Sequence, residues 1–76
     1  MLIVEVILMT QGELIHARRV LLRLTQQELG EKCGYEGKAA RTTVQHWETD
    51  RRIVPTERLR RLAKALKVPL DSPLIP

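Results

Sequence analysis

The chain has 76 residues, enough for one small domain, of which 43% are hydrophobic and only 3% aromatic. Its core must therefore be built from Leu, Ile, Val and Ala, which favours a bundle of helices. The formal net charge of +4 and the pI of about 9.8 favour an anionic partner such as nucleic acid.

Residues that enzymes and metal proteins commonly need are scarce. Cys33 has no second cysteine to pair with, and His16 and His46 give no metal-ligand spacing with it. The single serine, Ser72, has no base beside it in the sequence. The apolar run at 2–8 is too short to span a membrane. We therefore expect a reduced, cytoplasmic protein that is no enzyme, binds no metal or cofactor, and does not associate with membranes.

Residues 1–9 are predicted to be a separate N-terminal segment, and all but Glu5 are apolar. The β-branched run at 2–8 predicts a short strand. A lone strand needs a partner, so Val4 and Val6 are candidates for an antiparallel ribbon with a second subunit. The alternative is that the segment is an extension upstream of an internal start at Met9.

The first predicted helix opens on a capping box. In Thr10-Gln11-Gly12-Glu13 a hydroxyl stands three residues before a carboxylate, the spacing at which each satisfies the other's backbone N–H. A helix is predicted over 11–23. The apolar residues at helical spacing behind the box are Leu14, Ile15, Ala17, Leu21 and Leu22.

A second capping box, at 25–28, opens a short helix predicted over 26–33. Leu29 and Cys33 are expected to face inward, which makes Cys33 an inert core residue. Gly34 is the expected stop, because glycine accepts the left-handed conformation that ends many helices.

The third predicted helix spans 39–49, after a turn of small and polar residues at 34–38. Ala40, Val44 and Trp47 recur at steps of three and four residues, which indicates the buried face.

The fourth predicted helix follows a basic loop and starts at Pro55, a residue suited to a first helical turn. It runs to about Lys67, and a single turn at 69–72 is the candidate fifth helix. Its core-facing residues are Leu59, Leu62, Ala63 and Leu66. The expected fold is thus an all-α, compact bundle of four to five helices over 10–72, with a tail at 73–76 and with or without the N-terminal strand.

Two short helices joined by a glycine-containing turn form a helix-turn-helix. The stretches TQQELG at 25–30, VQHWE at 44–48 and the run from Arg58 to Val68 resemble, in this order, the lambda-repressor and Cro type of helix-turn-helix domain. The resemblance implies a DNA-binding regulator whose helix three lies in the major groove. The turn before that helix is about four residues longer than the family's usual turn, with the excess at 35–38.

The outer side of helix three, opposite Val44, carries the candidate base contacts. Arg41 suits guanine and Gln45 suits adenine, because each offers a bidentate pair to those bases. Thr42 suits a thymine methyl or a phosphate. For His46 we expect contact with a base or phosphate rather than a metal.

Candidate phosphate contacts surround this helix. Gln26 lies in the first turn of helix two, where side-chain and backbone donors together can hold a phosphate oxygen. Thr43 is a second-rank candidate, because its hydroxyl can instead bond its own backbone. The full set is Gln26, Lys38, Thr43, Arg51, Arg52 and Arg58.

The resemblance also implies structural and dimer positions. Arg19 and Glu48 match a pair that forms a buried salt bridge in relatives, and Trp47 matches a position that packs under the loop after helix three. Relatives often form dimers through the region after helix four. The candidate residues there are Leu70, Leu74 and Ile75.

The hypothesis from sequence is a nucleoid-associated, homodimeric repressor that binds double-stranded DNA at a near-palindromic operator. The alternative is an antitoxin-like or adaptor module whose main role is to bind a protein partner, with DNA binding for autoregulation. A third hypothesis is a non-specific nucleic-acid binder, whose affinity would depend strongly on salt and hardly on the sequence of the DNA.

Overall fold

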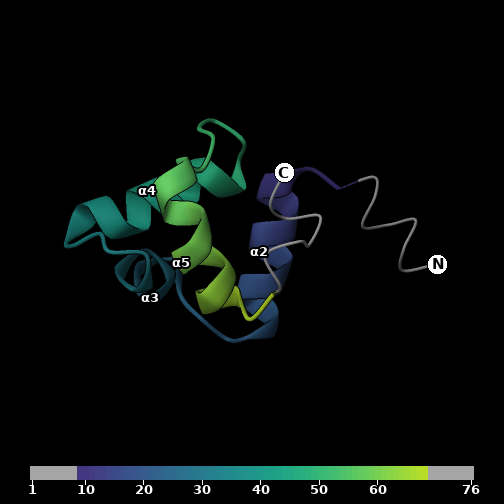
Figure 1. Ribbon diagram of the computed structural model, residues 1–76, viewed down its shortest axis with the longest axis horizontal. Coiled ribbons are helices and arrows are strands. Elements are labelled where there is room, and N and C mark those ends of the chain that lie inside the picture. The colour runs from purple at the N-terminus through teal and green to yellow at the C-terminus, as the bar shows by residue number, and fades with distance from the viewer. Residues whose placement is uncertain (1–8, 69–76) are drawn as a thin grey trace.

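The computed structural model describes residues 9–68, and Figure 1 shows them as a bundle of helices. The predicted all-α bundle is confirmed, and no strand occurs within the described residues. The helices are α2 (Gln11–Leu21), α3 (Gln26–Lys32), α4 (Lys38–Glu48) and α5 (Thr56–Leu66). The expected strand with Val4 and Val6, the turn at 69–72, and the residues Leu70, Leu74 and Ile75 lie outside the described part of the chain.

Both predicted capping boxes are present. The hydroxyl oxygens of Thr10 and Thr25 accept hydrogen bonds from the backbone N–H groups of Glu13 and Glu28 at 3.1 and 3.0 Å. Each carboxylate in turn accepts a bond from its threonine's N–H at 2.8 Å. The hydrogen bonds from Thr25 lower the pKa of Glu28, first through its backbone and then through its side chain. The local sequence therefore sets where α2 and α3 begin.

Helix ends fall at residues in the left-handed region. Helix α2 ends at Leu21 rather than at Arg23 as predicted, because Arg23 has a φ of 59°. Gly34, with a φ of 97°, is the expected stop after α3. Lys67, with a φ of 57°, closes α5. Helix α4 begins at Lys38, one residue before the predicted start, so Lys38 belongs to the helix and not to the turn.

The core joins all four helices. Leu29, Cys33, Val44 and Trp47 are buried as predicted, and Val54 of the loop after α4 joins them. The remaining buried members of the cluster are Ile15, Leu62 and Leu66.

Helix α2 departs from the expected burial pattern. Ala17 is exposed, and Leu21 keeps 66% of its surface accessible. The neighbouring Val20 is also exposed, at 53%. The apolar residues of α2 therefore extend beyond the face of the helix that packs against the core of the described residues.

Two glycines permit close packing of helices. A Cβ atom on Gly30 would overlap the backbone of Ala40, so α3 and α4 cross there with their main chains in contact. A Cβ on Gly12 would overlap the carbonyl oxygen of Trp47, at the end of α4. Helix α4 is thereby held between the start of α2 and the middle of α3.

Candidate nucleic-acid interface

Helix α4 has two distinct faces. Ala40, Val44 and Trp47 are buried against the core. On the opposite side four residues lie exposed at intervals of three and four, which places them on one stripe of the helix. They are Lys38, Arg41, Thr42 and Gln45. We call these four residues the α4 stripe; it contains two cations, two uncharged hydrogen-bonding side chains and no acid.

Thr43 and His46 lie at the edge of the α4 stripe, and both are half-buried. Nδ1 of His46 is buried with no hydrogen-bond partner among the described residues. A contact from His46 to DNA would therefore use the other ring nitrogen.

The start of α4 is open. Its N-cap is Gly37, with a φ of 59° and no side-chain cap for the first N–H groups of the helix. The carbonyl of Gly37 accepts a hydrogen bond from the Gln27 amide at 3.0 Å, which ties the turn to α3. The same amide also donates to Glu31 at 3.0 Å. With Lys38 as its first residue and Arg41 about one turn further on, this end of α4 combines backbone donors, the positive end of the helix dipole and two cations.

Glu48, at the far end of α4, binds side chains from two other helices. Its side chain is 5% exposed, and its Oε2 lies 2.5 Å from Nε of Arg19 in α2. His16 Nδ1 approaches Oε1 at 2.9 Å, and the Gln26 amide donates to it at 3.2 Å. Burial raises the pKa of Glu48, but the hydrogen bonds from Arg19, His16 and Gln26 outweigh it and leave the pKa below its ordinary value.

We call Glu48 and its partners Arg19, His16 and Gln26 the Glu48 cluster. This cluster fixes the orientation of α4 against α2 and α3. It contains the Arg19–Glu48 pair that the resemblance implies. It also occupies the amide of Gln26, which the sequence suggested for phosphate contact. The backbone N–H of Gln26, in the first turn of α3, is the other donor at this position.

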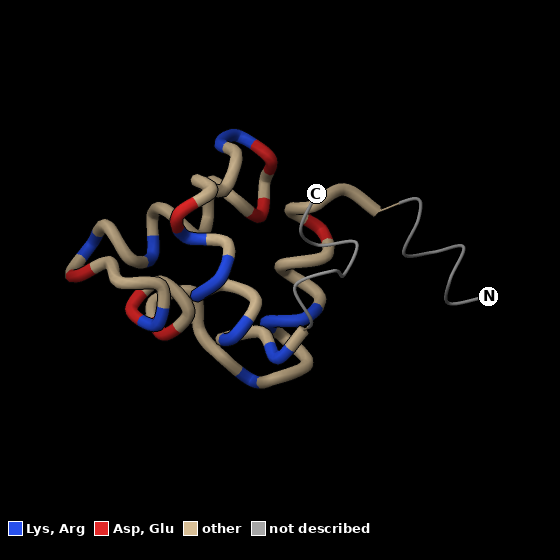
Figure 2. The backbone as a smooth tube through the Cα atoms, in the orientation of Figure 1, with Lys and Arg blue, Asp and Glu red and all other residues tan. Residues whose placement is uncertain are grey.

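The first residues of the loop after α4 are attached to α2 and to α4. The Asp50 carboxylate accepts bonds from the Thr10 hydroxyl at 2.6 Å and the Gly12 N–H at 3.0 Å, at the start of α2. The N–H groups of Arg51 and Arg52 both donate to the carbonyl of His46, at 2.9 and 3.3 Å. Both arginine side chains are exposed. In Figure 2 the tip of the loop after α4 has the colour of Lys and Arg.

Arg58 and Trp47 stabilise the turn before α4. The Arg58 guanidinium donates to the carbonyl of Cys33 at 2.9 Å and lies 4.6 Å from the centre of the Tyr35 ring. Tyr35 packs edge-on against Trp47, with 5.8 Å between ring centres. Trp47 is 2% exposed and shares the core cluster with Val54, so its ring is not open for stacking on a base. The sequence suggested Arg58 for phosphate contact, but its guanidinium is engaged within the domain.

Cys33 is fully buried beneath this turn. Burial raises the pKa of its thiol to about 11, against the opposing effect of Arg58 and Arg61. The thiol is therefore protonated at neutral pH and unreactive.

The structure brings together most of the predicted base-contact set on α4, and it adds residues that sequence reasoning missed. Gln27 holds the turn before α4, Asp50 holds the loop after it, and His16 joins the Glu48 cluster. No local sequence signal could identify these roles, because each depends on a partner 10 or more residues away.

A family model for helix-turn-helix domains, HTH_3, matches residues 15–72. Such domains are DNA-binding regulators, and the fold and the exposed α4 stripe agree with that class. The chain belongs to this family, the lambda-repressor and Cro type of helix-turn-helix domain. Searches of curated proteins and of solved structures each return no significant match.

Among the helices within residues 9–68, none combines the length and the apolar character that spanning a membrane requires. Within the same range, no three His, Cys, Asp or Glu side chains gather as a metal site would require.

Proposed function

We propose that the protein is a homodimeric repressor that recognises a specific operator by inserting α4 into the major groove. The observation that carries the proposal is the α4 stripe, because it lies directly opposite the buried face of a rigidly held helix. Arg41, Thr42 and Gln45 offer the donor and acceptor types that distinguish base pairs in that groove. Lys38 lies one turn nearer the open end of the helix.

Each residue of the stripe has a proposed partner. Arg41 pairs with guanine through two parallel hydrogen bonds, and Gln45 pairs with adenine. Thr42 contacts a thymine methyl or a phosphate. His46, at the edge of the stripe, contacts a base or phosphate through Nε2, since its Nδ1 is buried.

Phosphate contacts position the domain on the duplex. Lys38 and the uncapped N–H groups of α4 serve on one side, and the exposed Arg51 and Arg52 on the other. Thr43 and the backbone of Gln26 add neutral donors between them. Arg58 contributes positive charge but acts mainly by holding the turn at Tyr35.

The operator is proposed to be near-palindromic, with half-sites about 34 Å apart, so that two α4 helices enter successive major grooves. The candidate dimer residues remain Leu70, Leu74 and Ile75, with Val4 and Val6 as the second set. A repressor of this kind acts in the cytoplasm, on the nucleoid.

One observation favours the alternative of an adaptor that binds another protein. Ala17, Val20 and Leu21 place exposed apolar surface on α2. Changing Leu21→Ser should reveal its role in sedimentation experiments. A weakened homodimer would assign the surface to self-association, whereas co-purification of a specific protein with the wild type and its loss from the variant would favour a protein partner.

The test of the proposed function is selection of bound duplexes from a random DNA pool, followed by titration against a scrambled duplex at physiological salt. We expect a near-palindromic site bound at least about 10³-fold more tightly than the scrambled one. Equal affinity for all duplexes, falling steeply with salt, would contradict the proposal and favour non-specific binding.

A further inference from the structure

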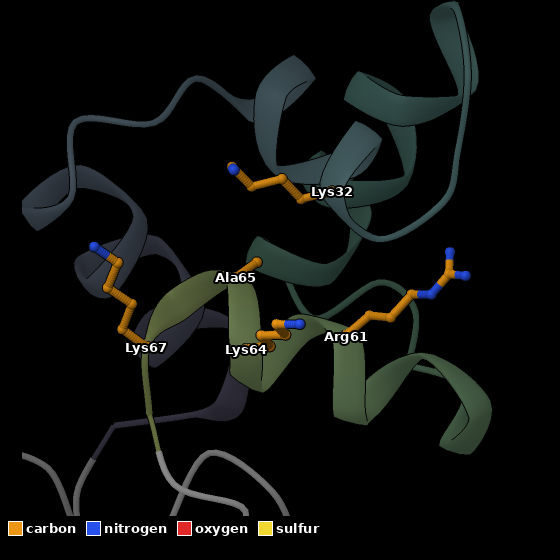
Figure 3. A pocket seen from close by; sticks show the side chains of 5 residues that line it. All are labelled: Lys32, Arg61, Lys64, Ala65 and Lys67. Carbon is orange, nitrogen blue, oxygen red and sulfur yellow. The ribbon is translucent and has the colours of Figure 1, made fainter.

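A second basic surface lies between the C-terminal halves of α3 and α5, with a hollow of about 400 Å³ (Figure 3). Cationic side chains line nearly all of it, and Ala65 provides an apolar patch between them. The four cations are Lys32, Arg61, Lys64 and Lys67. We call this hollow the α3–α5 groove.

No carboxylate among residues 9–68 forms an ion pair with the cations of the α3–α5 groove. Within residues 9–68 both ion pairs involve Glu48, so none of the four cations has a carboxylate within 4 Å. Lys32 helps to lower the pKa of Glu28, which lies one helical turn earlier on α3, but the two side chains form no ion pair. Each cation near a helix C-terminus is favoured by the helix dipole, but together they repel one another. A ligand that brings negative charge relieves that repulsion.

The groove is separate from the proposed DNA surface. No residue of α4 or of the loop after it lines the groove. Lys32 also lies six residues beyond Gln26 on α3, which is about 9 Å further along the helix axis and away from the Glu48 cluster. The protein can therefore hold DNA on α4 and a second partner here.

Shape and composition narrow the kind of anion. The groove is concave and lies between two helices, whereas DNA readout needs an element that projects into the duplex. Three of its cations are lysines, whose long aliphatic stems add apolar surface beside Ala65. An extended peptide with spaced carboxylates matches both features, because its side chains reach the cations while its aliphatic atoms cover Ala65.

We propose that the α3–α5 groove binds a short acidic segment of a partner protein. Carboxylates of that segment pair with Lys32, Lys64 and Lys67, and Arg61 lies at one end of the groove. The interaction goes beyond the proposed repressor function, since it gives the DNA-bound protein a means of recruiting or responding to a second protein.

The test uses the full chain and a fluorescently labelled peptide of alternating Glu and Ala, with the matching Gln and Ala peptide as a neutral probe. The groove variant is Lys32→Gln with Lys64→Gln. Its matched control is Arg23→Gln with Arg60→Gln, which removes the same charge from exposed positions that do not line the groove. Thermal unfolding establishes that both variants remain folded.

Fluorescence anisotropy should show the acidic peptide binding and the neutral one not. The groove variant should bind the acidic peptide about tenfold more weakly, a loss of about 1.4 kcal/mol, and the control less than about twofold more weakly. Equal weakening in both variants would overturn the proposal, because attraction would then follow net charge alone. A larger loss of duplex DNA affinity in the groove variant than in the control would also overturn it, by assigning the groove to DNA phosphates.

Discussion

The change Glu48→Gln removes the charge that joins α2, α3 and α4 while keeping the size of the side chain. Arg19 would lose its ionic partner at a site where its side chain is 13% exposed and that of Glu48 is 5% exposed. Removing one member of a buried pair typically costs about 3–5 kcal/mol, because the remaining charge is uncompensated. Gln keeps one acceptor oxygen, and Arg19 keeps its bond to the carbonyl of Leu24 at 2.8 Å. We therefore expect a loss of roughly 2–3 kcal/mol of unfolding free energy.

Urea denaturation followed by Trp47 fluorescence measures this loss, because Trp47 is 2% exposed in the folded state and reports its own exposure on unfolding. The matched control is Glu36→Gln, the same chemical change at an exposed position in the turn before α4. The control should change stability by less than about 0.5 kcal/mol. A loss of that small size for Glu48→Gln would refute the view that the Glu48 cluster holds α4 in place.

The acid dependence of stability, the close packing of Gly30 and the burial of Cys33 give three further predictions. Since the pKa of Glu48 is lowered in the folded state, its contribution is complete above its ordinary value of 4.5 and is lost as pH falls below it. The stability gap between wild type and Glu48→Gln should therefore narrow in acid, and a gap that widens there would contradict the direction of the shift. Gly30→Ala should lower the free energy of unfolding by roughly 3 kcal/mol in the same denaturation assay, because its methyl group would overlap the Ala40 backbone, whereas Gly37→Ala meets no atom within 4 Å and should cost less. The Cys33 thiol, with a pKa of about 11, should react with a disulfide reagent at pH 8 only after denaturant is added.

The sequence predicts local features of this fold well. Thr10 and Thr25 fix the starts of α2 and α3, because the partners in a capping box are three residues apart. Gly34 fixes the end of α3 for an equally local reason. Ala40, Val44 and Trp47 recur at steps of four and three residues, and this spacing identifies the buried face of α4 and hence the exposed face.

Features that depend on distant partners are not predictable in this way. Asp50, in the loop after α4, accepts a hydrogen bond from the backbone of Gly12 at the start of α2, and nothing near Asp50 in the sequence indicates that role. The sequence suggested phosphate contact for Arg58 as it did for Arg51 and Arg52. In the structure Arg58 contacts Tyr35 and Cys33 inside the domain, whereas the other two arginines are exposed. Leu21 has the helical spacing of a core residue but is largely exposed, because spacing alone does not show which element packs against a side chain.

Base recognition by the α4 stripe is the central claim, and the most direct measurement compares the affinity of Arg41→Ala and wild type for the selected operator and for operators changed at one base pair. Arg60→Ala is the control, because Arg60 is an exposed arginine on α5, outside the stripe. We predict that Arg41→Ala weakens operator binding by about 1–3 kcal/mol and relaxes the preference at a single base-pair position, while Arg60→Ala leaves that preference intact. If Arg41→Ala instead weakened binding to every duplex equally and no more than Arg60→Ala, α4 would not be reading bases in this protein.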